Sequence, residues 1–243
     1  MLWLLALVAF YAGIQNTLAG GGSFITFPTL LLAGLDPIAA NITSTVALFP
    51  CQITSGLAGR KLVEGVPPVP FRWLVLVSLL GGIAGALLLL ITPPTFFAKL
   101  VPWLVLFATT MFAWGSFGRR SVAAQRKLAP KWVLGIQGLI AIYGGYFGGG
   151  IGFLMLAMLT LAGLGVRAAG ASKNMLAMVM NASAVLIFLG SGQVVWHIAA
   201  TMAVAAVVGA SCGNWLLHRL PERYLRIFIV LVGSVLTVWL FVR

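Results

Sequence analysis

Long apolar stretches separated by short polar gaps dominate the chain. Ten such segments can be drawn, at roughly 2–18, 24–34, 38–59, 71–91, 99–117, 132–147, 152–164, 168–190, 195–217 and 223–242. Most are about as long as a helix that crosses a hydrocarbon core of roughly 30 Å. Apolar and polar positions do not alternate over long runs, so a transmembrane β-barrel is not expected. The pattern predicts an all-α membrane protein.

The second and seventh segments are too short to span a bilayer comfortably. Each follows a glycine cluster, formed by Gly20, Gly21 and Gly22 in the first case and by Gly149 and Gly150 with their neighbours in the second. Short, interrupted helices at corresponding places in two halves of a chain are a sequence indicator of a transporter binding site. We therefore expect two glycine-tipped hairpins built from broken helices.

The two halves align without a gap when one is shifted by 129 residues. The shift superposes the glycine clusters, then the run Leu-Ala-Gly-Leu at 32–35 on 161–164, then a polar triplet at 43–45 on 172–174. The chain is therefore expected to hold two related repeats, each a hairpin followed by three transmembrane helices. Their expected ranges are 1–118 for the first repeat, 119–131 for a basic cytoplasmic linker and 132–243 for the second repeat.

Basic residues predict the orientation in the membrane. The linker is the most basic part of the chain, so it should face the cytoplasm. Counting crossings outward from the linker places both termini outside. A hairpin adds two crossings or none, so each half crosses an odd number of times and the halves have opposite orientation. The sequence thus predicts inverted-topology repeats whose glycine tips can meet near the midplane.

Composition supports a membrane protein. The chain is 61% hydrophobic and only 7% charged, whereas a soluble domain carries roughly 25% charged residues. Its net charge of +12 comes from short clusters between apolar segments, which the positive-inside rule explains without a nucleic-acid partner. Cys51 and Cys212 both lie within apolar segments and are expected to be packed small hydrophobic residues rather than a disulfide.

The glycine clusters are candidate anion sites. The helix that follows each cluster begins with free N–H groups and the positive end of its dipole, which bind anions without a charged side chain. Ser23 is placed to cap the first of these helices and could also face a ligand. The alternative is that the glycines allow close helix packing. Two matched clusters before shortened helices favour the binding interpretation.

Polar side chains follow each short segment. Asn41, Thr43 and Ser44 lie near the start of the third segment, and Ser172 and Asn174 lie at the equivalent place in the eighth. Hydroxyl and amide donors suit an oxyanion, which needs several hydrogen bonds in a dry site. The alternative is that the hydroxyls bond to their own helix backbone.

Lys173 is the most deeply placed cationic residue within an apolar segment. A charge in the membrane costs several kcal/mol, and this one would attract an anion. The alternative is that its side chain reaches the cytoplasmic headgroups. Gln52 and Asn181 lie two turns further along their helices, where they either line the same cavity or bridge helices.

Acidic residues are scarce. Asp36, Glu64 and Glu222 are the only ones, and all lie near segment ends. A sodium or proton carrier of the usual acidic type is therefore disfavoured. His197 and His218 are far apart in the sequence and suggest no metal site, and no nucleophile–base pair is visible. We expect neither an enzyme nor a cofactor.

Both halves carry an ordered set of motifs. The first has its glycine run, Pro28, the Thr43-Ser44 pair and the basic end Arg60-Lys61. The second has a Ser-Lys pair, an asparagine and a G-x-V-x-W ending, at Ser172, Lys173, Asn181, Gly192, Val194 and Trp196. In this order, over nearly the whole chain, the sequence resembles the sulfite exporter TauE/SafE family of permeases. The resemblance implies a helical carrier for sulfite, organosulfonates or related anions in the cytoplasmic (inner) membrane of a bacterium, without a tightly bound cofactor.

We expect a secondary transporter that moves a small sulfur-containing anion by alternating access. An anion-selective channel with the same central site is the alternative, and a membrane enzyme or lipid-binding scaffold is a third hypothesis. Expected partners are the anion, membrane lipid and, as an open option, further copies of the chain. The expected substrate-binding residues are Gly20, Gly21, Gly22, Ser23, Phe24, Asn41, Thr43, Ser44, Gln52, Gly149, Gly150, Gly152, Phe153, Ser172, Lys173, Asn174 and Asn181.

Overall fold

Each α-helix of the computed structural model overlaps one of the ten apolar segments. The structure describes the chain except for residues 19–20, 118–128, 217–221 and 243, so most of the expected linker lies outside the described residues. Within the described part, no strand is present. The helices are α1 (Leu2–Leu18), α2 (Ser23–Leu32), α3 (Pro37–Ala58), the 3-10 turn η1 (Arg60–Leu62), α4 (Phe71–Ile91), α5 (Pro94–Phe117), α6 (Pro130–Tyr146), α7 (Ile151–Leu161), α8 (Val166–Leu189), α9 (Trp196–Leu216) and α10 (Glu222–Val242). The all-α prediction is thereby confirmed.

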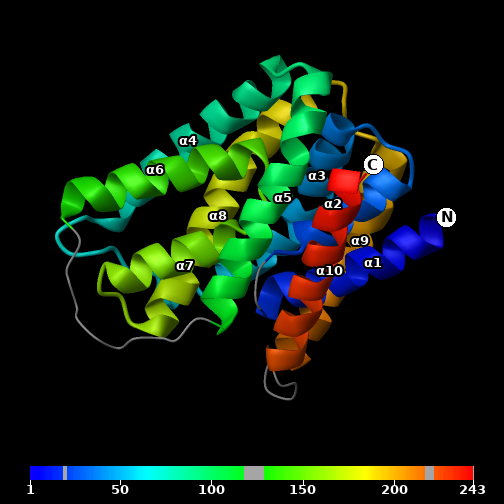
Figure 1. Ribbon diagram of the computed structural model, residues 1–243. Helices are drawn as coiled ribbons and strands as arrows, with labels where there is room; N and C mark the ends of the chain where they lie inside the picture. Colours follow the sequence, from blue (N-terminus) through cyan, green and yellow to red (C-terminus); the bar gives the residue numbers. More distant parts are fainter. Residues whose placement is uncertain (19–20, 118–128, 217–221, 243) are drawn as a thin grey trace.

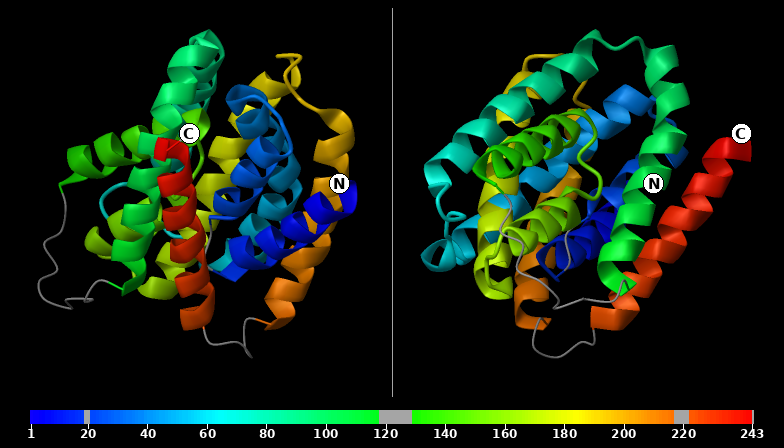
Figure 2. Two further views of the ribbon diagram at one scale, coloured as in Figure 1. Left: turned by 45° about the vertical axis from the view of Figure 1, so that its right-hand side comes forward. Right: turned by 60° about the vertical axis from the view of Figure 1, so that its left-hand side comes forward.

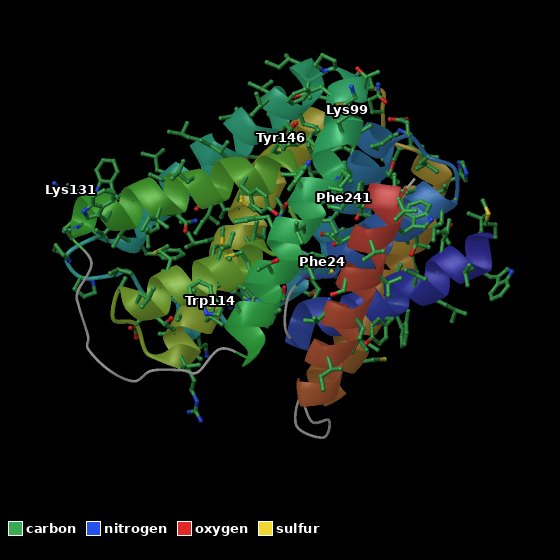
Figure 3. The ribbon with its side chains drawn as sticks, in the orientation of Figure 1. Phe24, Lys99, Trp114, Lys131, Tyr146 and Phe241 are labelled. Carbon is green, nitrogen blue, oxygen red and sulfur yellow. The ribbon has the colours of Figure 1, made fainter. Side chains whose placement is uncertain are left out.

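Within the described residues, four helices are long and apolar enough, by length and composition, to cross a membrane: α4, α5, α8 and α9. Helix α3 has 22 residues, but its many polar residues lower its hydropathy. Large apolar side chains lie on the outside of the molecule, including Ile91 at 77% exposure. Trp114, at 71% exposure, is another (Figure 3). Such a surface is stable only in lipid.

The two short helices expected after the glycine clusters are present. Helix α2 has 10 residues and α7 has 11, and each packs against the helix before it, α1 and α6 respectively (Figure 1). Both end in the same motif. Leu35 N–H donates to the carbonyl of Leu30, and Leu164 N–H donates to that of Leu159, beside Gly34 and Gly163 with positive φ. The repeated Leu-Ala-Gly-Leu run therefore makes the same turn twice.

Two helix boundaries have clear local causes. Helix α3 begins after Asp36, whose carboxylate accepts hydrogen bonds from the amides of Ile38 and Ala39 at 3.1 Å each. Helix α5 begins at Pro94, earlier than the expected residue 99. Proline is well suited to a first helical position because its missing N–H would be unpaired there in any case.

Helices from the first half of the chain pack mainly against helices from the second half. Helix α1 lies along α9, and α6 lies along α4 (Figure 2). Glycines permit both contacts, because a Cβ at Gly209 of α9 would overlap the carbonyl of Phe10, and one at Gly85 of α4 would overlap that of Ile142. In addition, α3 packs against α9 and α8 packs against α4.

Helices α3 and α8 cross at the centre and run in opposite directions. A Cβ at Gly56 of α3 would lie 3.4 Å from the carbonyl of Asn174, and one at Gly59 would lie 3.2 Å from Cβ of Ala171. Progress along α3 is therefore progress backwards along α8. The later half of α3 faces the earlier half of α8, and this crossing forms one wall of the site described next.

Candidate binding pocket

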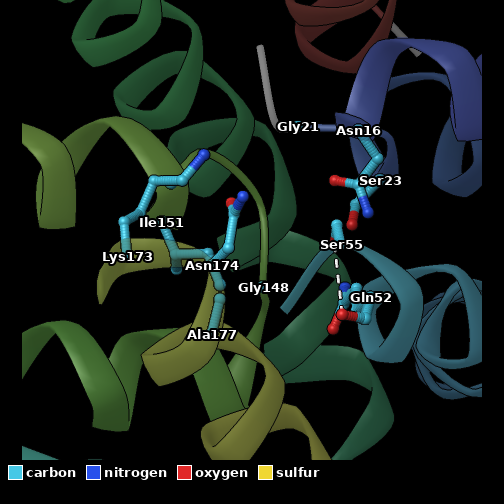
Figure 4. Close-up of a pocket in the computed structure, with 11 residues that line it drawn as sticks. Asn16, Gly21, Ser23, Gln52, Ser55, Gly148, Ile151, Lys173, Asn174 and Ala177 are labelled. Atoms are coloured by element: carbon cyan, nitrogen blue, oxygen red, sulfur yellow. Dashed lines mark hydrogen bonds between the residues drawn. The ribbon is translucent and has the colours of Figure 1, made fainter. Parts of the chain in front are cut away.

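A polar pocket lies where the tips of both short helices meet α3 and α8 (Figure 4). It contains about 440 Å³ of space not filled by atoms, part of it open to the surroundings. Residues from both halves of the chain contribute to it. The lining residues are Asn16, Gly21, Ser23, Gln52, Ser55, Gly148, Ile151, Gly152, Lys173, Asn174 and Ala177.

Both short helices point their N-terminal ends at this polar pocket. Gly21 has φ +84° and Gly150 has φ +76°, which are left-handed conformations that side chains other than glycine rarely adopt. Among the described residues, no acceptor pairs with the amides of Ser23, Ile151 or Gly152. Unpaired first-turn amides and two positive dipole ends favour a bound anion.

The expected cap of α2 is corrected by the structure. The N-cap is Gly22, and no side chain caps the helix. Ser23 is instead the first helical residue. The Ser23 hydroxyl does not cap the helix, so it remains available to a ligand in the polar pocket, which Ser23 lines.

Lys173 gives the polar pocket its charge. It lies two turns inside α8, next to Asn174, and both side chains face the pocket from one side. The lining residues, all from the described part of the chain, include no Asp or Glu. The pocket thus pairs one cation with amide and hydroxyl donors, a combination that suits an anion and not a cation.

Helix α3 supplies the opposite wall. Figure 4 shows Gln52 and Ser55 across the pocket from Lys173, with Asn16 and Ser23 above them. The Ser55 hydroxyl donates to the carbonyl of Gln52 at 3.1 Å. The side-chain oxygen of Gln52 is buried and has no partner among the described residues. A 180° rotation of that amide exchanges its oxygen and nitrogen, so Gln52 can present a donor to a ligand.

Three expected binding residues of α3 lie outside the pocket in buried contacts. The Asn41 side chain donates to the carbonyl of Tyr146 at 3.0 Å. The Thr43 hydroxyl accepts from the amide of Val195 at 3.2 Å. The Ser44 hydroxyl lies 2.6 Å from that of Thr26 on α2. All three hold other segments against α3.

Other expected residues are also placed away from the pocket. The Ser172 hydroxyl accepts from the amide of Glu64 at 2.9 Å and donates to its carbonyl at 2.8 Å. Asn181 donates to the carbonyl of Ala177, one turn earlier in its own helix. Phe153, the third residue of α7, is buried and does not line the polar pocket.

The remaining expected residues come from the glycine tips and from the facing parts of α3 and α8. Gly21, Gly152, Ser23, Gln52, Lys173 and Asn174 line the pocket, whereas Gly22 caps α2 and Gly150 caps α7. Phe24 and Gly149 line a second, smaller pocket beside it. Gly20 lies outside the described residues.

Two polar pocket residues were not expected from the sequence. Ser55 follows Gln52 by three positions, so helical periodicity alone places it on the same face. Asn16 is a polar residue near the end of an otherwise apolar helix, and its side chain donates to Sγ of Cys51 at 3.4 Å. Cys51 is buried, as expected, whereas Cys212 is exposed on the surface of α9.

Metal-binding groups do not gather anywhere in the described part of the chain. No three His, Cys, Asp or Glu side chains come together there as a metal site would require.

Comparison with known proteins identifies relatives over almost the full length. The family model for the sulfite exporter TauE/SafE matches residues 5–240. A probable membrane transporter protein ORF9 from Sinorhizobium sp is 31% identical, over 98% of this chain and 91% of the relative. A probable membrane transporter protein from Haemophilus influenzae is 27% identical over 98% and 93%, and YfcA from Escherichia coli K12, also a probable membrane transporter protein, is 28% identical over 98% and 88%. No solved structure matches significantly.

Proposed function

The chain belongs to the sulfite exporter TauE/SafE family of membrane transporters, and we propose that it carries a small sulfur-containing anion across the cytoplasmic membrane by alternating access. The observation that carries the proposal is the polar pocket. It combines Lys173, unpaired amides at two helix N-termini and no carboxylate. A sulfite, sulfonate or related oxyanion offers several acceptor oxygens to such donors.

The packing of the helices supports a two-fold related, inverted repeat. If α1 to α5 correspond to α6 to α10, the pairing of α1 with α9 corresponds to that of α6 with α4. The pairing of α3 with α9 likewise corresponds to that of α8 with α4. The central helices α3 and α8 run in opposite directions, as helices related by an axis in the membrane plane must.

Two hydrogen-bonded contacts support alternating access. Thr43 of α3 holds the loop after α8 through Val195, and Ser172 of α8 holds the loop after α3 through Glu64. Thr43 and Ser172 correspond under the shift of 129 residues. We call these two contacts the Thr43 latch and the Ser172 latch. Related latches at opposite ends of the crossing helices are suited to close opposite faces in turn.

The polar pocket is offset toward one face. It lies beside the later part of α3 and the earlier part of α8, and these parts lead to Arg60 and Lys61 after α3 and to Arg167 at the start of α8. The positive-inside rule assigns that face to the cytoplasm. The Thr43 latch then lies on the external side, with both termini.

The test is binding and counterflow of the purified protein. Thermal shifts in detergent with sulfite, sulfate, thiosulfate, taurine and a sulfocarboxylate, at constant ionic strength and with cation controls, identify the anion through its stabilisation of the folded state. Saturable counterflow of that anion in proteoliposomes supports a carrier. Flux that does not saturate and shows no counterflow would favour the channel, and the absence of binding by every anion would contradict the proposed substrate class.

Lys173→Gln tests the charge directly. The change keeps a hydrogen-bond donor of similar reach and removes the positive charge, so we expect anion affinity to fall roughly thirtyfold, or about 2 kcal/mol. Lys173→Arg should retain most of the affinity. Lys99→Gln, at the far end of the molecule (Figure 3), is the matched control and should bind as the unchanged protein does. Equal affinity in Lys173→Gln and the control would exclude the charge role.

A further inference from the structure

Lys173 is the only titratable side chain among the residues that line the polar pocket. Figure 4 shows it extended beside Asn174, across the pocket from Gln52 and Ser55. Within the described part of the chain, its amine forms neither an ion pair nor a hydrogen bond. When the pocket is empty, a positive charge on this side chain therefore has no counterion in the protein.

The elements that surround Lys173 bring no carboxylate to it. Helix α8 packs against α3, α4, α6, α7 and η1. Asp36 caps the far end of α3, and Glu64, in the loop after η1, is exposed and contacts α8 only through its backbone, at Ser172. The other titratable side chains of these elements and of α8 lie outside the pocket lining; they are Cys51, Arg60, Lys61, Arg72, Lys131, Tyr143, Tyr146 and Arg167.

Alternating access makes the missing counterion important. In such a cycle the pocket changes faces twice, once with the anion bound and once empty. The bound anion is a partner for the charge of Lys173. In the empty protein, a protonated Lys173 would be enclosed in a site of low dielectric constant without a partner, which is the costly form of a buried charge. A lysine, unlike an arginine, can avoid this cost by releasing its proton.

We propose that Lys173 is the proton-coupling site of the transporter and that one proton crosses the membrane with each anion. This inference rests on the proposed function. The ammonium form binds the anion, and the two cross together. After the anion leaves, one N–H bond breaks, the proton passes to water on the side of release, and the neutral amine returns with the empty pocket. A proton from water on the first side then restores the ammonium ion. With a singly charged anion, the cycle moves no net charge.

A pH gradient across proteoliposomes tests the coupling. The labelled anion is methanesulfonate, whose sulfonate stays ionised, and potassium with valinomycin holds the membrane potential at zero. Acid outside should drive methanesulfonate inward against its own gradient, by up to about tenfold for each unit of pH difference. Conversely, an inward methanesulfonate gradient at equal pH should acidify the interior, as measured with a trapped pH dye. A membrane potential without a pH gradient should drive no accumulation.

Lys173→Arg separates coupling from binding. The guanidinium ion pairs with the anion but does not release its proton. The loaded protein can then still exchange one anion for another, whereas the empty protein cannot return. We expect counterflow to continue at a reduced rate and pH-driven accumulation to be lost. Lys99→Arg, the same change at the far end of the molecule (Figure 3), is the matched control and should keep both activities.

The inference and the proposed function fail in different ways. If the unchanged protein accumulates methanesulfonate in response to a membrane potential and not to a pH gradient, the lysine keeps its charge throughout the cycle and the inference is wrong. Accumulation by Lys173→Arg equal to that of the control also overturns it. In both cases, counterflow leaves the proposed function standing. If the unchanged protein shows no counterflow of methanesulfonate, the proposed function itself is contradicted.

Discussion

The polar triplets of α3 and α8 occupy corresponding places in the two halves of the chain, but only some of their side chains make corresponding contacts. Thr43 and Ser172, at the first position, both hold a loop from the other half of the chain. At the second position, Ser44 is buried against Thr26, whereas Lys173 lines the polar pocket. At the third, Thr45 bonds to the carbonyl of Asn41 in its own helix, whereas Asn174 lines the pocket.

At another pair of corresponding positions, the residue of α3 lines the polar pocket and the residue of α8 does not. Gln52 of α3 lines the polar pocket, whereas Asn181 of α8 bonds to its own helix. Both differences place the polar pocket at one level of the crossing, beside late residues of α3 and early residues of α8. The comparison teaches that positions which correspond in the two halves of the sequence differ in their contacts, and that these differences place the polar pocket on one side of the crossing of α3 and α8.

The largest expected effect comes from making the first triplet resemble the second. Ser44→Lys would bury a charge where Ser44 is 1% exposed and packed against Thr26. An unpaired charge in such a site costs several kcal/mol, so we expect little folded protein to be recovered from membranes. Ser55→Lys, in the same helix but on the polar pocket, should fold. Recovery and melting temperature in detergent are the measurements, and a stable Ser44→Lys protein would contradict the packing described for α3.

An intermediate effect is expected at the first position of each triplet. Ser172→Ala leaves the amide and carbonyl of Glu64 without their partner, and Thr43→Val does the same for the amide of Val195. Each should lower stability by about 1–3 kcal/mol, with the larger loss in Ser172→Ala because it breaks two hydrogen bonds.

Unfolding in detergent measures this difference. Ser211→Ala is the control, since that exposed hydroxyl bonds only to its own helix, and it should change stability by less than about 0.5 kcal/mol. If all three variants were equally stable, the two latches would not hold the loops.

The smallest effect distinguishes Gln52 from Asn181. Gln52→Ala removes one neutral hydrogen-bonding group from the polar pocket, which should weaken anion binding about fivefold. Asn181→Ala removes a bond within α8 and should leave affinity within about twofold. Titration of each purified variant with the anion found in the screen gives both values. A larger loss in Asn181→Ala would place the binding site at the other end of the crossing.

Much of the fold could be predicted from the sequence, because lipid imposes simple requirements on a chain. The ten apolar segments, the two short helices and the repeated Leu-Ala-Gly-Leu turn all follow from segment length and glycine position. Local chemistry was harder to predict. Ser23 was expected to cap α2, and Gly22 does so instead, since a one-residue shift in a helix start exchanges a cap for a free hydroxyl.

Part of the candidate site could likewise be predicted from the sequence, and part of it could not. The sequence by itself determined that glycine tips, short helices and Lys173 belong together, because few arrangements tolerate broken helices and a cation within a membrane. Only the tertiary structure decided which polar side chains remain available. Thr43 and Ser172 are engaged by loops from the other half of the chain, and Ser44 is engaged by Thr26 of the neighbouring helix α2. Gln52 and Ser55 face Lys173 because α3 and α8 cross in opposite directions. Hydrogen-bonding capacity is a property of a residue, but whether it is already satisfied depends on what packs against it.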